Sequence, residues 1–166
     1  MLRFLGRVPR NARPPVRPRV DRLASSISQW KTIVSRWNRE EMSDRLVILV
    51  VDDNGDLVAS TAQLLESAGY AAVPAYSARE AVDLIDEIER IDLVLSDVRM
   101  PDVDGFDLLR VLRHRFPSLP VILMSGLPVT SDDVVPQGAT IVGKPFDATE
   151  LQELIRRKVA SRQTAP

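Results

Sequence analysis

Short apolar runs alternate with helix-like patterns along the chain from residue 42 onward. A continuous apolar run is typical of a strand buried on both faces, whereas apolar residues that recur every three or four positions are typical of an amphipathic helix. These patterns predict strands over 46–51, 71–75, 92–96, 121–124 and 140–142. They predict helices over 57–68, 78–90 and 106–116, with a last helix that Asp147 caps and that runs to about residue 160.

The first two predicted helices each have one apolar face. In the first helix this face is formed by Leu57, Thr61, Leu64, Leu65 and Ala68. In the second it is formed by Ala81, Val82, Leu84, Ile85 and Ile88. Strands that alternate with such helices favour an α/β fold, with a doubly wound parallel sheet of five strands covered by helices on both faces.

Polar residues that carry chemistry stand directly after the predicted strands. They are Asp52 and Asp53, Asp97, Ser125 and Gly126, and Lys144 and Pro145. Ligands of a doubly wound sheet bind at the carboxyl ends of its strands, so we expect these residues to converge there. Carboxylates packed together repel one another, and Mg2+ prefers their oxygens as ligands. Because lysine and serine suit a phosphoryl group, the pattern predicts metal-assisted phosphoryl transfer onto an aspartate.

Four short motifs together resemble the receiver domains of bacterial two-component systems. They are Val-Asp-Asp-Asn at 51–54, Asp-Val-Arg-Met-Pro-Asp-Val-Asp-Gly at 97–105, Met-Ser-Gly at 124–126 and Gly-Lys-Pro-Phe at 143–146. The resemblance implies the flavodoxin-like strand order 2-1-3-4-5. It also implies that the domain is a phosphoacceptor rather than an enzyme, and that its partner is a histidine kinase or a histidine phosphotransfer protein.

The resemblance further implies a metal site around the phosphoacceptor. Asp97 would accept the phosphoryl group. Asp53, Asp97 and the backbone carbonyl of Arg99 would bind Mg2+ directly, and Asp52 would act through a bound water.

The remaining site residues would contact the phosphoryl group, by the same resemblance. Lys144, joined to Pro145 by a cis peptide bond, would bridge to the incoming group. Ser125 would bond one of its oxygens after transfer, and Gly126 would leave access to it. Many relatives carry Tyr or Phe where this chain has Ile141, so activation is expected to work through the loop after the fourth strand instead.

The segment from Ser125 to Lys144 departs from the family pattern in length, since it is about three residues shorter than usual. It contains Pro128, Pro136 and Gly138. Proline removes a backbone donor and opposes the helical conformation before it. We therefore expect the fourth helix to be short, irregular or absent.

Charge divides the chain into two regions. Residues 1–41 hold ten Lys and Arg against three Asp and Glu, a balance of +7, while the remainder holds twelve against twenty, a balance of −8. The basic, proline-rich region is predicted to be a disordered extension, with a possible short amphipathic helix over 25–41. It could also be a transit peptide, a nucleic-acid-binding arm, a linker or an extended gene model. Residues 42–162 form the expected receiver domain, and 163–166 a tail.

Three functions remain open from the sequence. The first is a stand-alone receiver whose output is contact with an as yet unknown downstream protein. The second is a receiver detached from a hybrid histidine kinase. The third is an aspartate-nucleophile phosphatase of the haloacid dehalogenase type, which the missing Asp-x-Asp pattern after the first strand disfavours. The chain has no cysteine, no run long enough to span a membrane and no recognisable helix-turn-helix, so we expect a cytoplasmic protein that does not bind DNA.

Overall fold

The computed structural model describes residues 44–128 and 135–163, and the expectations for residues 1–41 and 164–166 lie outside this part of the chain. The described strands are β1 (Val47–Val51), β2 (Ala71–Ala75), β3 (Leu93–Asp97), β4 (Val121–Ser125) and β5 (Ile141–Gly143). The described helices are α3 (Gly55–Ser67), α4 (Ala78–Glu87), α5 (Gly105–Arg115) and α6 (Ala148–Gln163). No described helix is long and apolar enough to cross a membrane.

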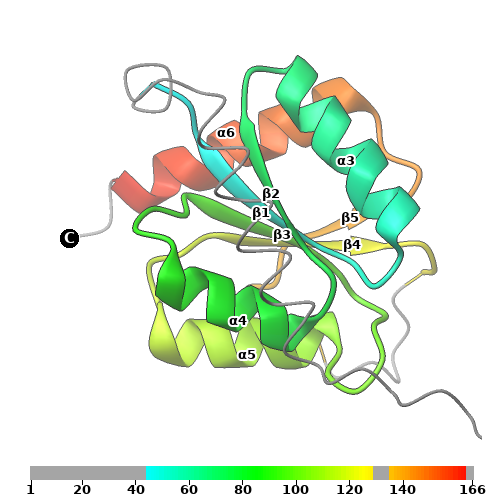
Figure 1. Cartoon of the computed structure of the whole chain (residues 1–166), viewed down its shortest axis with the longest axis vertical. Helices are drawn as coiled ribbons and strands as arrows, with labels where there is room; N and C mark the ends of the chain where they lie inside the picture. The colour runs from blue at the N-terminus through cyan, green and yellow to red at the C-terminus, as the bar shows by residue number, and fades with distance from the viewer. Residues whose placement is uncertain (1–43, 129–134, 164–166) are drawn as a thin grey trace, which may run out of the picture.

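The strands form one parallel sheet in the order β2-β1-β3-β4-β5, which confirms the predicted doubly wound topology. The register sets the carboxyl ends of the central strands side by side. Val51 pairs with Ser96, Asp97 with Met124, and Ser125 with Gly143. Residues that follow different strands therefore meet at one edge of the sheet, which lies to the right in Figure 1.

Helices cover both faces of the sheet, α4 and α5 on one and α3 and α6 on the other (Figure 1). Because the strands are covered twice, successive strand residues belong to different cores: Leu49 packs with the α4 and α5 side, and Ile48 with the α3 and α6 side. Both are completely buried, as are nearly all residues of β1, β3 and β4. Burial of two apolar layers supplies most of the driving force for this fold.

Two helices differ from their predicted form. Helix α3 starts at Gly55, with Asn54 as its cap, and Leu57 is 42% exposed rather than inward. Its buried stripe contains Val58, Thr61 and Leu65, and Leu57 is displaced from this stripe by about 100° because it precedes Val58 by one position.

Helix α4 ends at Glu87 rather than at residue 90. Ile88 follows with an extended backbone, and its N–H still donates to the Leu84 carbonyl. Its side chain is buried, so the predicted inward position of Ile88 is correct although the residue lies outside the helix. A β-branched residue tolerates the extended conformation well.

The connection between β4 and β5 contains no helix among its described residues, 126–128 and 135–140. The predicted short or irregular fourth helix also falls on residues 129–134, which lie outside the described residues. In the described part, Gly138 has a positive φ of 74°, a conformation that favours glycine.

Candidate functional site

The carboxyl edge of the sheet brings together Asp52, Asp97 and Lys144. The Lys144 Nζ atom donates hydrogen bonds to Oδ2 of Asp52 and to Oδ1 of Asp97, each at 2.7 Å. The three residues come from the ends of β1, β3 and β5. The sequence predicted this convergence from the position of each residue directly after a strand.

The two carboxylates are also held from their other sides. Asp52 Oδ1 accepts the Asn54 N–H at 2.9 Å, and Asp97 Oδ2 accepts the Arg99 N–H at 2.7 Å. Every carboxylate oxygen of this pair therefore has a donor. The donors on one side are backbone groups of the adjoining loops, and Lys144 is the shared donor on the other.

The position of Lys144 is set by the backbone. Its N–H donates to the Ser125 carbonyl at 2.7 Å, next to the β4–β5 pairing, and its bond to Pro145 is cis, as predicted. Asp52 is tied to the neighbouring strand in a similar way, since its N–H donates to the Ala75 carbonyl at 3.2 Å. These contacts fix the backbone positions of Lys144 and Asp52.

Burial makes the charges of this cluster matter. Asp52 is 3% exposed and Asp97 is 8% exposed, so little solvent screens them. Burial alone lowers the pKa of Lys144, but its hydrogen bonds to Asp52 and Asp97, together with their negative charges, outweigh this and raise the pKa above its ordinary value. Lys144 is therefore an ammonium at neutral pH, and the three groups carry a net charge of −1.

The loop after β3 holds the Asp97 backbone through Gly105, a residue whose role the sequence did not reveal. The Gly105 N–H donates to the Val98 carbonyl at 2.8 Å. A Cβ atom at Gly105 would lie 2.2 Å from the Asp97 carbonyl oxygen, so only glycine fits at this position. Asp102, within the same loop, has a positive φ of 67°.

The other predicted site residues differ in burial: Ser125 is buried. Asp53 and Gly126 are exposed. The Ser125 hydroxyl donates to the Leu127 carbonyl at 2.5 Å, and so is engaged with its own loop rather than with Asp97. Among the residues that the structure describes, no three Asp, Glu, His or Cys side chains are close enough to form a metal-binding cluster. Of the three predicted carboxylates, Asp52 and Asp97 therefore meet at Lys144, and the role of Asp53 stays a prediction.

Comparison with known proteins identifies the family to which this fold belongs. Residues 48–156 match the family model of the response regulator receiver domain, and this range contains every site residue described above. The chain belongs to this family.

Two curated relatives illustrate the similarity. Response regulator Rre1 from Synechocystis sp. (strain ATCC 27184 / PCC 6803 / Kazusa) is 35% identical over 132 residues, which cover 75% of this chain and 56% of the relative. Transcriptional regulatory protein CpxR from Escherichia coli (strain K12) is 36% identical over 119 residues, which cover 66% of this chain and 47% of the relative. The receiver chain thus spans about half the length of these two curated relatives.

Solved structures of receiver domains show the same fold over their whole length. A receiver domain protein (CheY-like) from Methanospirillum hungatei JF-1 is 31% identical with a TM-score of 0.66, and the match covers 72% of this chain and 98% of that one. A receiver domain protein from Clostridium thermocellum has the same TM-score of 0.66 at 28% identity, covering 71% of this chain and 97% of that one.

Proposed function

We propose that this receiver domain accepts a phosphoryl group on Asp97 from a histidine kinase or a histidine phosphotransfer protein. The observation that carries the proposal is the buried Asp97 carboxylate at a strand end, with the Lys144 ammonium 2.7 Å from one of its oxygens. Membership of the receiver family supports it, since receivers of two-component systems are phosphoacceptors rather than enzymes with a separate substrate.

The transfer is a displacement at phosphorus. An Asp97 carboxylate oxygen forms a bond to phosphorus while the bond from phosphorus to the donor's leaving group breaks, and the electron pair of that bond leaves with the donor. The product is an acyl phosphate, which has more negative charge than the carboxylate it replaces. Lys144 is placed to stay beside the transferred group as a point charge on its oxygens.

The residues at this edge fit a bound Mg2+ by the chemistry of their donors. Asp52, Asp97 and Lys144 leave a net charge of −1, and exposed Asp53 adds a further carboxylate at the rim. We propose that Asp53, Asp97 and the Arg99 carbonyl would bind the ion directly, and that Asp52 would bind it through water. When bound, the ion would neutralise charge on the phosphoryl oxygens during transfer.

We propose that the output is contact with a downstream protein. The described residues form a single sheet with its helices, and the site occupies one edge of it. A receiver detached from a hybrid histidine kinase would use the same site, so the two arrangements share this chemistry and differ in the partner that supplies the phosphoryl group.

Phosphorylation with a small acyl phosphate and Mg2+ tests the proposal. Wild-type protein should gain one base-labile phosphoryl group by intact-mass analysis, and Asp97→Asn should gain none. Asp56→Asn, which removes an exposed carboxylate from the first turn of α3, is the matched control and should label normally. Labelling of Asp97→Asn at the wild-type rate would refute the assignment.

The metal assignment has a separate readout. Asp53→Ala removes one proposed direct ligand from the rim, where the side chain is exposed and little packing is lost. We expect Mg2+ affinity measured by calorimetric titration to fall by about tenfold or more, since a charged ligand is lost. Unchanged affinity in this variant would contradict the proposed ligand set.

A further inference from the structure

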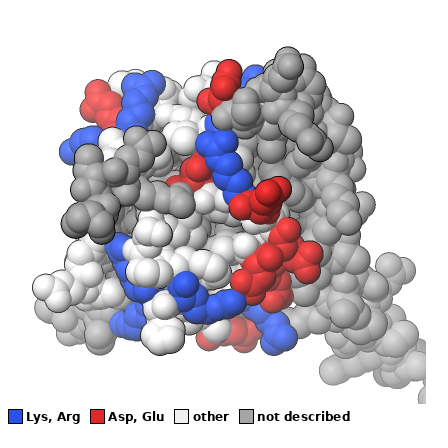
Figure 2. Space-filling view, turned by 90° about the vertical axis from the view of Figure 1, so that its left-hand side faces the viewer, with Lys and Arg blue, Asp and Glu red and all other residues white. Residues whose placement is uncertain are grey.

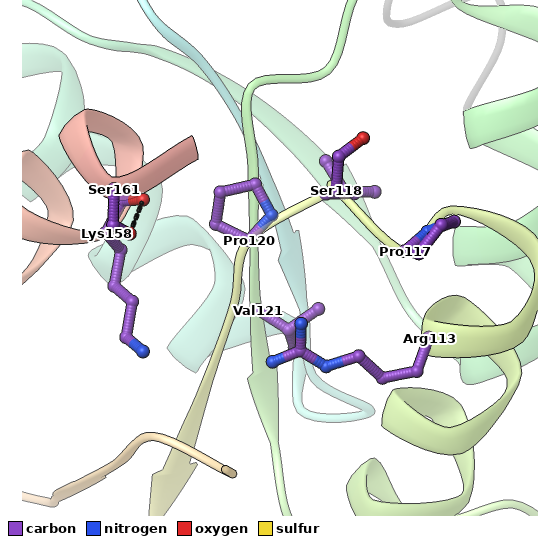
Figure 3. A pocket seen from close by; sticks show the side chains of 8 residues that line it. Arg113, Pro117, Ser118, Pro120, Val121, Lys158 and Ser161 are labelled. Atoms are coloured by element: carbon purple, nitrogen blue, oxygen red, sulfur yellow. Dashed lines mark hydrogen bonds between the residues drawn. The ribbon is translucent and has the colours of Figure 1, made fainter. Parts of the chain in front are cut away.

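A pocket of about 170 Å³ lies at the opposite end of the sheet from the phosphorylation site, where β4 begins. Its walls come from the end of α5, the 117–121 segment and the last turns of α6 (Figure 3). Val121 lines the pocket, whereas Ser125 at the other end of β4 borders the Asp97 site. Four residues of an extended strand span about 13 Å, so the two sites are separate.

Two cationic side chains line this pocket, Arg113 from α5 and Lys158 from α6, and no acidic side chain does. In Figure 3 the Arg113 side chain reaches across the start of β4 toward the side of the pocket from which Lys158 projects. Neither has an ion-pair partner within residues 44–128 and 135–161. The neighbouring Arg115, in contrast, binds Asp86 at 2.9 Å and lies over the Phe116 ring.

The local electrostatics favour an anion. Helices α5 and α6 both end near the pocket, and each helix carboxyl end carries a partial charge of about −0.5. The two cations contribute +2 against roughly −1 from both helix ends, so the pocket stays positive. Figure 2 shows the face at this end of the sheet, where blue and red side chains are interspersed around white surface.

The rest of the lining sets the kind of anion. Leu119, Pro120 and Val121 are buried and form an apolar wall, and Ser118 supplies a hydroxyl group at the rim, whereas the Ser161 hydroxyl donates to the Lys158 carbonyl at 2.8 Å. We propose that the pocket binds a small free anion with a carboxylate or phosphate group, its charge between Arg113 and Lys158 and any carbon chain against the apolar wall. The volume of about 170 Å³ suits a compact molecule.

Titration of 15N-labelled protein at constant ionic strength tests the proposal. Succinate serves as the carboxylate probe, inorganic phosphate as the phosphate probe and succinamide as the neutral control. Succinate or phosphate should shift the Leu119 and Val121 amide signals saturably, and succinamide should not. The saturable shift should persist in Asp97→Asn, because the pocket does not include the phosphorylation site.

Charge-removing variants locate the binding. Arg113→Gln and Lys158→Gln should each weaken binding by about tenfold, since each removes one charge-assisted hydrogen bond. Arg156→Gln is the matched control, because Arg156 is exposed on α6 outside the pocket lining. Arg113 is exposed, so Arg113→Gln should fold like wild type. If Lys158→Gln is unstable, the affinity of Arg113→Gln decides the outcome.

Three results would overturn the proposal. They are a shift that does not saturate, equal binding in Arg113→Gln and wild type, and an equal loss in Arg156→Gln, which would indicate general screening. Loss of phosphorylation in Asp97→Asn has no bearing on these readouts, so this inference and the proposed phosphoacceptor role can fail independently.

Discussion

The Lys144 ammonium lies 2.7 Å from a carboxylate oxygen of Asp97, although 47 positions separate the two residues in the chain. The same nitrogen is 2.7 Å from Asp52, so one cation joins two buried carboxylates from different strands. Removal of the cation leaves two like charges facing each other with little solvent between them. This relationship makes Lys144 both a structural and a functional residue.

Lys144→Met should lower the free energy of unfolding by about 1–2 kcal/mol, because loss of one partner from a buried ion pair leaves uncompensated charge. Partial access of water to the site reduces this cost. The substitution should also slow phosphorylation of Asp97 severely. Added Mg2+ should stabilise this variant more than wild type, because a divalent cation can take over the lost neutralisation. Denaturant unfolding with and without Mg2+ measures both effects.

Arg156→Met is the control for this prediction, since Arg156 is exposed on α6 outside both the Asp52, Asp97 and Lys144 cluster and the pocket lining, and it should label normally. The pH dependence gives a second check. The pKa of Lys144 is raised in the folded protein, so its contribution to stability is complete below its unfolded pKa of about 10.4 and is lost as pH rises through the higher folded pKa. A Lys144-dependent loss of stability between pH 6 and about 8 would contradict this account.

Gly105→Ala should destabilise the domain by about 3 kcal/mol and slow phosphorylation. The added Cβ would meet the Asp97 carbonyl oxygen at 2.2 Å and the Val98 Cα at 3.0 Å, and both are backbone atoms that cannot move without shifting the site. Gly55→Ala is the matched control, because the nearest atom to its Cβ position is Tyr76 Cε1 at 3.9 Å, an ordinary contact distance. Equal stability of the two variants would show that the loop after β3 can relax.

The sequence predicted the strands and the cluster of Asp52, Asp97 and Lys144 because both follow from simple rules. Buried parallel strands are continuous apolar runs, and the residues after them meet at one edge. The finer geometry depended on backbone paths that periodicity does not encode. Asp52 is buried, whereas Asp53, the next residue, is exposed. Successive side chains at a strand end point to opposite sides.

Other features were missed because they depend on packing that the apolar pattern does not encode. The apolar pattern could not show that Leu57 lies outside the buried stripe of α3, since Leu57 and Val58 are equally apolar. Gly105 stood within a family motif, but only the structure shows its contact with the Asp97 carbonyl. Arg113 and Lys158 likewise line one pocket although they belong to two helices that are far apart in the sequence.

A protein that begins at Met42 should fold and accept phosphate like the full chain. The two described cores are built from residues between Leu46 and Val159, and the described sheet begins only at Val47. The basic composition of residues 1–41 is also poorly suited to forming a core. Thermal unfolding measures the stability of the shortened protein, and phosphorylation with a small acyl phosphate measures its ability to accept phosphate. Failure to fold would mean that Trp30 or Trp37 packs against the domain.

The Ser125 hydroxyl is engaged with its own loop. It donates to the Leu127 carbonyl at 2.5 Å, so a turn toward a phosphoryl group on Asp97 must break this contact and release the loop behind it. A charge-assisted hydrogen bond worth about 1.5–3 kcal/mol can offset that loss and shift a two-state loop by roughly tenfold. We therefore expect phosphorylation to change hydrogen exchange most strongly between Gly126 and Gly138.

Ser125→Ala separates this relay from the transfer itself. The variant should still accept phosphate on Asp97, because the carboxylate is held by Lys144 and by the Arg99 N–H, and neither contact involves the hydroxyl. It should lose most of the change in hydrogen exchange. Ser125→Thr, which keeps a hydroxyl, should restore much of it. A full exchange response in Ser125→Ala, or a response centred on another part of the domain, would place the relay elsewhere, since Ile141 offers neither a ring nor a hydroxyl as a substitute.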